Sequence, residues 1–340
     1  MIKGLILAAG RGTRLRPLTD RRPKPLVPIA GRPILQYNIE NLRDAGIDDI
    51  VIVVNPDSDE VERYFGDGSR IGVRLTYVAQ HELRGTAHAV YQARDAVGDS
   101  PFILVFGDNM TGYRLRDLAA SLEKYSGGSV LAVCAGGDHR KHAVVCVDGD
   151  RVCLIEERPE VPRGPYTCAG MYAFTPSIFP AIEKIQPVAN GEYYLPHAIQ
   201  ELINDGQPVY YCLAEGWRVN INTPADMMQA LAYVVRDMAD GYRHALRRGA
   251  APEVLLGANV HLDENVSLGG CSYIGSGCRI GSNSYIGNSM LMENVLVGSD
   301  CVVHNAILGQ GVVVPDGTRA LGDGAPLVVP DGRVITPSRN

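Results

Sequence analysis

Residues 2–14 read IKGLILAAGRGTR, and this stretch decides the fold of the first part of the chain. The near-continuous apolar run over residues 2–8 is typical of a strand that is buried on both faces of a parallel sheet. Gly10 and Gly12 then let the chain turn sharply and let backbone N–H groups approach a bound anion. The sequence therefore predicts an α/β domain that begins with a strand and a phosphate-binding loop.

Strand-like and helix-like segments alternate after this loop. Residues 33–45 have a proline in the first turn and Gly46 at the end, which predicts a helix. A second helix is predicted over residues 86–96. Apolar runs predict further strands at residues 50–54, 73–78, 101–106, 129–134, 143–147, 152–156, 170–174 and 209–213. We expect a Rossmann-like α/β fold with a mixed, mainly parallel sheet, and ligands bound beyond the carboxyl ends of its strands.

A long amphipathic helix is predicted to follow this first domain, which we assign to residues 1–223. Thr223 can cap the helix, Pro224 suits its first position, and Asp226 favours its first turn. Apolar residues then recur at helical spacing from Met227 to Leu246. We therefore expect a linking helix over residues 224–249.

The last third of the chain carries a six-residue repeat. Aliphatic side chains recur at Leu256, Leu262, Leu268, Ile274, Ile280, Ile286 and Met292, and a slipped phase continues to Val314. Three such hexads would close one triangular coil of about eighteen residues, with the aliphatic side chains stacked inside. The pattern resembles the hexapeptide-repeat, left-handed parallel β-helix. We expect a short β-helix over residues 250–318 and a C-terminal tail over residues 319–340.

Length and charge restrict the class of protein. A chain of 340 residues exceeds the usual size of a single core, which agrees with more than one domain. Its net charge of −6 gives no electrostatic basis for binding nucleic acid or an anionic membrane. No apolar stretch is long enough for a membrane span. The eight cysteines form no C-x-x-C pair, and with no export signal we expect a cytoplasmic protein.

The loop after the first strand continues as LAAGRGTRLRPLT over residues 7–19, followed by RPKPLVP over residues 22–28. It is neither a Walker loop nor the dinucleotide fingerprint, because the required Gly-Lys-Ser/Thr and third glycine are missing. Arg14 and Lys24 would place two cations near one anionic ligand. The alternative interpretation is a solvated basic loop.

This string resembles the motif of the sugar nucleotidyltransferases, the nucleoside-diphosphate-sugar pyrophosphorylases. In detail the chain is most similar to long, two-domain glucose-1-phosphate thymidylyltransferase-like members. The resemblance covers residues 1–235 and the repeats at 254–318. It implies a nucleotidyl transfer from a nucleoside triphosphate to a sugar 1-phosphate, or a sugar-like cyclitol 1-phosphate, with release of pyrophosphate. It also implies in-line attack on the α-phosphorus, with dTTP or UTP favoured.

The resemblance implies three catalytic residues. Arg14 would bind the departing pyrophosphate, Lys24 the oxygens around the α-phosphorus, and Asp108 the magnesium ion. The implied nucleotide-binding residues are Leu7, Ala8, Ala9, Gly10, Gly12, Thr13, Arg14, Lys24, Gln80, Gly85 and Thr86. Gln80 would pair with the imide edge of uracil or thymine, since an amide both donates and accepts.

The resemblance also implies a Mg²⁺ site. Asp108 follows a buried strand in the sequence FGDN, where a carboxylate can hold a metal ion that bridges phosphates. The second ligand of the family lies in a string that here reads WRVNINTP, over residues 217–224. Asn220 replaces the usual aspartate, and its amide oxygen would bind the ion more weakly.

The implied sugar phosphate pocket departs most from the family pattern. Its residues are Asn109, Ala143, Glu157, Arg158, Cys168 and Gly170. Ala143 stands where a glycine usually lets the sugar approach, and Arg158 replaces a lysine that differs from it in reach and shape. We therefore expect an acceptor other than glucose 1-phosphate, such as another hexose, an amino sugar or a cyclitol phosphate.

Two other interpretations stay open on the sequence alone. One is a non-catalytic regulatory homologue, because some pyrophosphorylase-like chains have that role. The other is a bifunctional enzyme with acyltransferase activity in the β-helix, for which His261 and His304 are the available histidines. The small number of coils favours a β-helix that joins subunits into a homo-oligomer.

Overall fold

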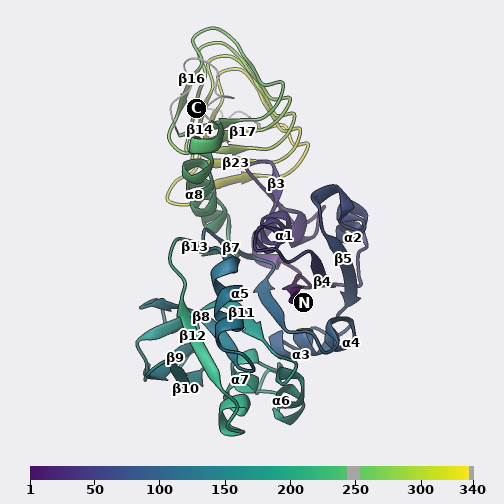
Figure 1. Cartoon of the computed structure of the whole chain (residues 1–340). Coiled ribbons are helices and arrows are strands. Elements are labelled where there is room, and N and C mark those ends of the chain that lie inside the picture. Colours follow the sequence, from purple (N-terminus) through teal and green to yellow (C-terminus); the bar gives the residue numbers. More distant parts are fainter. Residues whose placement is uncertain (243–252, 337–340) are drawn as a thin grey trace. The chain divides into compact units, whose positions relative to one another are not determined.

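The computed structural model describes residues 1–242 and 253–336 (Figure 1). The chain divides into two compact units. The first unit comprises Met1–Arg11 and Leu35–Arg218, and the second comprises Gly12–Ile34 and Val219–Asn340. This division differs from the domain boundaries expected from the sequence, because the loop at residues 12–34 groups with the C-terminal part of the chain.

A nine-stranded mixed sheet forms the centre of the first unit, in the order β5-β4-β1-β6-β11-β8-β12-β10-β9. The strands are β1 (Lys3–Leu7), β4 (Asp49–Val54), β5 (Arg74–Ala79), β6 (Phe102–Phe106), β8 (Ser129–Ala135), β9 (Val144–Asp148), β10 (Arg151–Glu156), β11 (Tyr166–Phe174) and β12 (Val209–Leu213). Pairing is parallel from β5 to β6 and between β8 and β12, and antiparallel elsewhere. The predicted mixed α/β sheet is confirmed.

Helices cover both faces of this sheet. They are α1 (Ile34–Asp44), α2 (Glu60–Phe65), α3 (Thr86–Gln92), α4 (Arg94–Val97), α5 (Leu115–Lys124), α6 (Ile178–Lys184) and α7 (Leu195–Asn204). One core joins α3, α6 and α7 to the sheet face that carries Phe102 and Phe174. On the other face α5 packs against β6, β8 and β11, and Leu42 of α1 lies over Gly4. The helix predicted over residues 86–96 is two helices, because the N–H of Ala93 turns back to Val90.

The long helix of the second unit is α8 (Pro224–Tyr242). Its start is the one expected from the sequence. The Thr223 hydroxyl accepts a hydrogen bond from the Asp226 N–H at 3.2 Å, and the Asp226 carboxylate accepts one from the Thr223 N–H at 2.7 Å. These reciprocal bonds satisfy donors that a helix start leaves without partners. The predicted extension over residues 243–249 lies outside the described residues.

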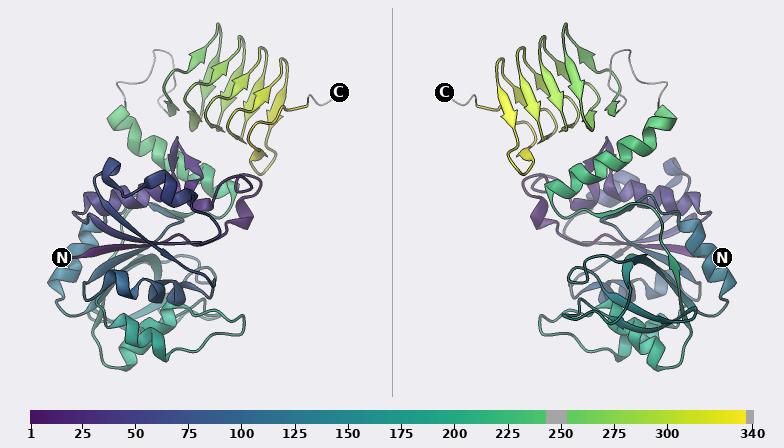
Figure 2. Two further views of the ribbon diagram at one scale, coloured as in Figure 1. Left: turned by 90° about the vertical axis from the view of Figure 1, so that its right-hand side faces the viewer. Right: turned by 90° about the vertical axis from the view of Figure 1, so that its left-hand side faces the viewer.

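The repeats fold into a parallel β-helix, whose stacked coils are visible in Figure 2. Its first sheet consists of β14 (Val254–Leu256), β17 (Ser272–Ile274), β20 (Met290–Leu291), β23 (Ala306–Leu308) and β26 (Leu327–Val329). The second consists of β15 (His261–Leu262), β18 (Arg279–Ile280), β21 (Leu296–Val297) and β24 (Val313–Val314). The third consists of β16 (Ser267–Gly269), β19 (Tyr285–Gly287), β22 (Val302–His304) and β25 (Arg319–Leu321).

The register of the β-helix explains the slipped repeat. Val254 pairs with Ser272, whereas Tyr273 pairs with Met290, so the second coil is one residue shorter than the first. The repeat also continues further than expected. β25 and β26 lie within residues 319–329 and pair in parallel with β22 and β23. That part of the expected tail is therefore part of the β-helix, and residues 337–340 lie outside the described range.

The remaining short strands are β2 (Pro28–Ile29) and β3 (Arg32–Pro33), which pair in the second unit, and β7 (Asn109–Thr111) and β13 (Arg218–Asn220). Over residues 1–242 and 253–336, no helix is both long enough and apolar enough to cross a membrane.

Candidate active site

The loop that contains Gly10 and Gly12, called the glycine loop below, begins in the first unit at the carboxyl edge of the sheet. Leu7 ends β1, Ala8 and Ala9 are buried, and Gly10 is exposed. The N–H of Ala8 donates to the carbonyl of Val53 at 2.8 Å, so the chain stays attached to β4 where it leaves the sheet. The first residues of the motif are thus held by the sheet, and the exposed part begins at Gly10.

Asp108 lies in the turn that follows β6, next to β1 in the same sheet. The N–H of Gly107 donates to the carbonyl of Leu7 at 2.8 Å. A Cβ atom on Gly107 would lie 2.8 Å from that same oxygen, so glycine lets the two strand ends approach closely. The Asn38 side chain also donates to the Gly107 carbonyl, at 3.3 Å. These contacts fix the turn that presents the partly exposed Asp108.

Residues 80–86 have partners within the protein. The Gln80 side chain is only 4% exposed, and its amide nitrogen lies 3.4 Å from the Gly85 carbonyl and 3.1 Å from Nδ1 of His88. Burial lowers the pKa of His88, which favours its neutral form. The base contact expected of Gln80 stays a prediction, and it requires this buried amide to become accessible.

The loop after Gln80 is attached to the loop before α7. Gly85 has φ +93°, and a Cβ atom there would lie 2.6 Å from the carbonyl oxygen of Tyr193. The Thr86 hydroxyl accepts a hydrogen bond from the Leu195 N–H at 3.1 Å. Glycine is thus needed at position 85 for contact with protein backbone, and its predicted role in nucleotide binding stays a prediction.

A buried amide lies beside Asp108. Asn109 is 1% exposed, and its Nδ2 donates to the carbonyl of Ala169 at 2.9 Å. Its Oδ1 is buried and has no hydrogen-bond partner among the described residues. Gly170 has φ +74°, and a Cβ atom there would lie 3.2 Å from this amide. The first residue of β7 and the irregular part of β11 thus meet at Asn109.

Arg218, which the sequence analysis did not select, contacts Cys168 of the expected sugar pocket and His142, the neighbour of Ala143. Its guanidinium donates to the carbonyl of Cys168 at 2.8 Å and to Nε2 of His142 at 3.3 Å. The backbone N–H of Cys168 in turn donates to the carbonyl of Ala143 at 2.9 Å. Arg218 directly follows Trp217, the only tryptophan in the sequence, and this position was the signal by which Arg218 could have been selected.

The electrostatics of this cluster follow from burial and from Arg218. Burial lowers the pKa of His142 to about 4, with the Arg218 charge acting in the same direction. Since arginine only donates, Nε2 of a neutral His142 accepts its hydrogen bond. Burial raises the pKa of the Cys168 thiol to about 12. Cys168 is therefore a protonated thiol and no nucleophile.

Glu157 and Arg158 contact each other. Nε of Arg158 donates to Oε1 of Glu157 at 2.6 Å, and the guanidinium lies 5.7 Å from the ring centre of Tyr194. Arg158 also has φ +45°, a backbone conformation that non-glycine residues rarely adopt. The expected sugar-binding carboxylate and the expected phosphate-binding cation thus form an ion pair.

In the second unit the glycine loop folds over Lys24. Gly12 has φ +65°, and a Cβ atom there would lie 2.6 Å from Cβ of Lys24. The Thr19 hydroxyl donates to the Gly12 carbonyl at 3.0 Å, while Thr13 begins a short 3₁₀ turn. Lys24 is 8% exposed, and Arg14 is exposed. Gly12 thus holds the loop against the stem of the buried lysine.

The two cations of the motif share one acceptor, Asn222, which the sequence analysis did not select. Oδ1 of Asn222 accepts a hydrogen bond from Arg14 at 2.8 Å and one from Nζ of Lys24 at 3.1 Å. Asn222 lies two residues after Asn220, the half-buried last residue of β13. No local pattern marked Asn222 in the sequence, because Arg14 and Lys24 lie about two hundred positions earlier.

The predicted metal ligands suit magnesium by their chemistry. Asp108 in the first unit offers carboxylate oxygens, and Asn220 in the second offers an amide oxygen; both are hard donors. Among the described residues no group of three or more His, Cys, Asp or Glu side chains is arranged for a metal ion. Magnesium is commonly bound through only one or two carboxylates together with substrate phosphates, so this donor set fits it.

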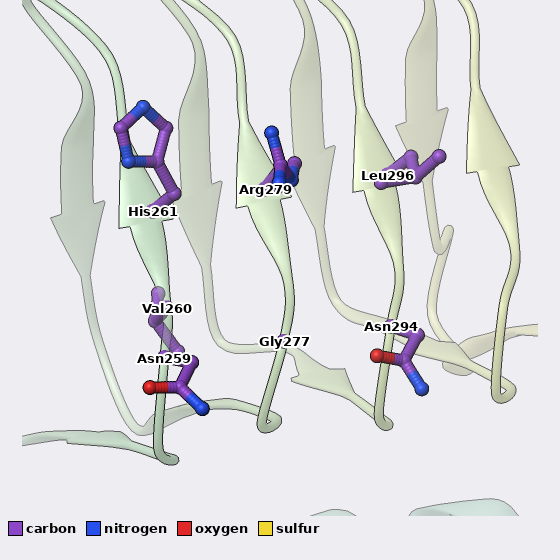
Figure 3. Close-up of a pocket in the computed structure, with 7 residues that line it drawn as sticks. All are labelled: Asn259, Val260, His261, Gly277, Arg279, Asn294 and Leu296. Atoms are coloured by element: carbon purple, nitrogen blue, oxygen red, sulfur yellow. The ribbon is translucent and has the colours of Figure 1, made fainter.

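The two histidines considered for acyl transfer lie on the β-helix. His261 lines an open groove of about 780 Å³ together with Arg279 and Leu296 of the neighbouring strands (Figure 3). Its Nε2 lies 3.1 Å from Asp263. His304 stacks on Tyr285 with ring centres 6.3 Å apart. Neither position by itself indicates acyl transfer.

Comparison with known proteins agrees with both halves of the chain. The family model for nucleotidyl transferases matches residues 3–235. The model for the GMPPB C-terminal domain matches residues 250–323. Most of the chain is therefore accounted for by a transferase domain followed by a β-helix domain.

Two relatives match this chain over nearly its whole length. The low-salt glycan biosynthesis nucleotidyltransferase Agl11 of Haloferax volcanii is 32% identical, over 96% of this chain and 98% of its own. A glucose-1-phosphate thymidylyltransferase of Streptomyces antibioticus is 30% identical, over 94% and 95%. A Bacillus anthracis crystal structure, assigned as a glucose-1-phosphate thymidylyltransferase in complex with sucrose, matches with TM-score 0.63 and 26% identity, over 68% of this chain and 94% of that one.

The chain belongs to the nucleotidyl transferase family. The resemblance to long sugar nucleotidyltransferases with a C-terminal β-helix is confirmed, and the protein is an enzyme that transfers nucleotidyl groups.

Proposed function

We propose that this enzyme converts a nucleoside triphosphate and a sugar or cyclitol 1-phosphate into a nucleoside-diphosphate sugar and pyrophosphate, with dTTP or UTP as the favoured nucleotide. The observation that carries the proposal is the nucleotidyl transferase match over residues 3–235. Relatives that match nearly the whole chain include a thymidylyltransferase for glucose 1-phosphate. Another relative, matching 67% of the chain, is a uridylyltransferase for the same sugar phosphate.

The residues of the glycine loop suit this chemistry. An oxygen of the acceptor's phosphate group attacks the α-phosphorus of the nucleotide and forms a new P–O bond. The bond between the α-phosphorus and the oxygen that bridges it to the β-phosphorus breaks. Pyrophosphate then leaves with the electron pair of that bond. Arg14 would hold the leaving phosphates, and Lys24 would hold oxygens at the α-phosphorus. Both cations act mainly by positioning and by offsetting charge that builds up in the transition state.

We propose Mg²⁺ as the cofactor, held through Asp108 and Asn220. When bound, Mg²⁺ supplies positive charge that offsets the negative charge of the phosphate groups. The protein's own contribution at this point is the turn after Gly107, which keeps the Asp108 carboxylate at the carboxyl edge of the sheet.

The proposed acceptor site is the one around Asn109. A buried acceptor atom without a hydrogen bond costs about 1–3 kcal/mol, so Oδ1 of Asn109 favours a ligand or water that donates to it. Sugar and cyclitol hydroxyls are such donors. Ala143 stands where the resemblance leads us to expect a glycine, and Arg158 is paired with Glu157. These departures support an acceptor other than glucose 1-phosphate.

A matrix assay tests the proposal. Purified enzyme would be given each common nucleoside triphosphate with each member of a panel of hexose, amino-sugar and cyclitol phosphates, and pyrophosphate release would be measured with Mg²⁺ present and with it chelated. We expect release that depends on both substrates and on Mg²⁺. A clear preference for glucose 1-phosphate would refute the acceptor proposal. No release with any pair would favour the non-catalytic alternative.

We also propose that the β-helix joins subunits into a homo-oligomer and that the enzyme works in the cytoplasm. The eight cysteines are all unpaired thiols, which suits a reducing compartment. Light scattering measures the oligomeric mass directly. Acetyl transfer from acetyl-coenzyme A, assayed on the same preparation, tests the bifunctional alternative.

A further inference from the structure

A single side-chain oxygen in the second unit holds both cations of the glycine loop. Oδ1 of Asn222 lies 2.8 Å from the Arg14 guanidinium and 3.1 Å from Nζ of Lys24. Arginine and lysine have only donor groups, so the atom between them must be the amide oxygen and not the amide nitrogen. The identity of the atom is therefore settled by chemistry.

Asn222 is itself held at the start of α8. Its backbone N–H donates to Oδ2 of Asp226 at 2.9 Å, and the N–H of Thr223 donates to the same oxygen at 2.7 Å. The helix that follows packs against β2, β14 and β17. Asn222 therefore has a fixed backbone, from which its side chain reaches residues about two hundred positions earlier in the sequence.

The neutrality of this acceptor matters physically. Two positive charges that both approach one oxygen repel each other strongly, so the loop needs an acceptor between them. A carboxylate would hold them more firmly, but it would cancel one of the two charges. The amide dipole of asparagine offsets the repulsion without adding a negative charge to the loop.

We propose that Asn222 is a positioning residue that presents Arg14 and Lys24 as a preorganised pair of cations to the polyphosphate chain of the substrate. The proposal rests on the proposed function, because the roles of Arg14 and Lys24 come from it. It goes beyond that function by assigning a role to Asn222, which was not among the predicted site residues. The neutral amide is the essential property: it aligns the two cations without adding a negative charge beside the phosphates.

The test compares Asn222→Asp with wild type and with Asn204→Asp. The first substitution keeps the size and an acceptor oxygen but adds a negative charge between the cations. The second adds the same charge at the exposed end of α7. Binding of inorganic triphosphate is measured by calorimetry. KM for the nucleotide, KM for the acceptor, kcat and the thermal midpoint are measured on the same preparations.

We expect Asn222→Asp to weaken triphosphate binding about tenfold and to raise the nucleotide KM by a similar factor, since one of two charge-assisted contacts is offset. The acceptor KM and the thermal midpoint should stay unchanged. Asn204→Asp should behave like wild type. Asn222→Ala, a second variant that removes the acceptor without adding charge, should also weaken triphosphate binding, because the cations lose their common partner.

Several results would overturn the inference. They are an Asn222→Asp enzyme with wild-type triphosphate affinity, an equal loss in Asn204→Asp, or a wild-type protein with no measurable triphosphate affinity. A role in the helix start alone would change the thermal midpoint and leave affinity intact. If wild type fails to release pyrophosphate with any acceptor while Asn222→Asp still weakens triphosphate binding, the proposed function fails and the inference stands.

Discussion

Asp108 is the residue whose charge the proposed reaction depends on most. We expect Asp108→Asn to lower Mg²⁺-dependent pyrophosphate release by at least about a hundredfold, because an amide removes the negative charge that holds the ion. The turn itself is fixed by Gly107 and Asn38, so the variant should remain folded, which thermal unfolding checks. Asp150→Asn in the exposed turn between β9 and β10 is the matched control. Substantial activity in Asp108→Asn at saturating Mg²⁺ would remove Asp108 from the metal site.

His142 makes the stability of the first unit depend on pH. Its pKa is lowered to about 4 by burial and by Arg218, whereas a histidine in the unfolded chain titrates near 6.5. Between these values the unfolded chain takes up a proton that the folded protein refuses, so stability is lost as the pH falls from about 6.5 towards 4. We expect the thermal midpoint to fall over this interval, and to fall less in His142→Gln.

His88 also contributes to the loss of stability at low pH, since burial lowers its pKa as well. His142→Gln should therefore reduce the loss and not abolish it. An identical pH dependence in wild type and His142→Gln would show that His142 is protonated with little cost in the folded protein.

The glycines of the motif show what the sequence can and cannot distinguish at this scale. Gly12 and Gly85 were predicted to contact the nucleotide. In the structure each allows close packing within the protein, against Lys24 and Tyr193 respectively. Both explanations require the absence of a Cβ atom, so the sequence cannot separate them. Asn222 was missed for a related reason, because its partners are distant in sequence.

At the scale of elements, the sequence predicted those segments that carry a local signal. The start of α8 and the hexads were predictable, because a cap and a six-residue period are visible in a short window. Helices α5 and α7 were missed. Their capping positions are Arg114 and Tyr194, and neither side chain bonds to the helix start. Their buried residues recur at helical spacing, as Leu115, Leu118 and Leu122 of α5 do, so the amphipathic pattern was present in the sequence although no cap marked it.

The β2–β3 hairpin offers a test of packing between elements of the second unit. Gly31 in its turn has φ +76°, and a Cβ atom there would collide with the hydroxyl of Tyr273 on β17. We expect Gly31→Ala to lower the free energy of unfolding by about 1–3 kcal/mol, from steric overlap together with backbone strain. Thermal or urea unfolding measures the change.

The double variant Gly31→Ala/Tyr273→Phe separates the two causes. Removal of the hydroxyl relieves the collision and leaves the strained φ, so the double variant should recover part of the loss. Tyr273→Phe alone is the control. If the double variant is as unstable as Gly31→Ala, the hydroxyl is not the obstacle and backbone strain accounts for the whole effect.

At the scale of the whole molecule, the grouping of residues 12–34 with the C-terminal part was not predictable from the sequence. It depends on contacts between residues about three hundred positions apart. The Arg22 guanidinium forms an ion pair with Asp331 and also contacts the sulfur of Met292. Both charged side chains are 17% exposed. The β-helix therefore supports the loop that carries Lys24, in addition to any role in assembly.

This ion pair predicts that the last coil of the β-helix influences nucleotide binding. Pro23 separates Arg22 from Lys24 and has little freedom in φ, so a shift of Arg22 should displace Lys24. We expect Asp331→Asn to raise the nucleotide KM about threefold to tenfold, since the partly buried Arg22 loses its counter-charge. The acceptor KM should stay near the wild-type value.

Asp316 provides a closely matched control for that substitution. Oδ1 of Asp316 accepts a hydrogen bond from the Ser299 N–H at 2.8 Å, and Oδ1 of Asp331 accepts one from the Gln310 N–H at 2.9 Å. The two carboxylates thus support equivalent turns, but Asp331 also binds Arg22. If Asp316→Asn raises the nucleotide KM as much as Asp331→Asn, the effect comes from weakened coils and not from the ion pair. A change confined to Asp331→Asn would mean that the β-helix acts on the loop through Arg22.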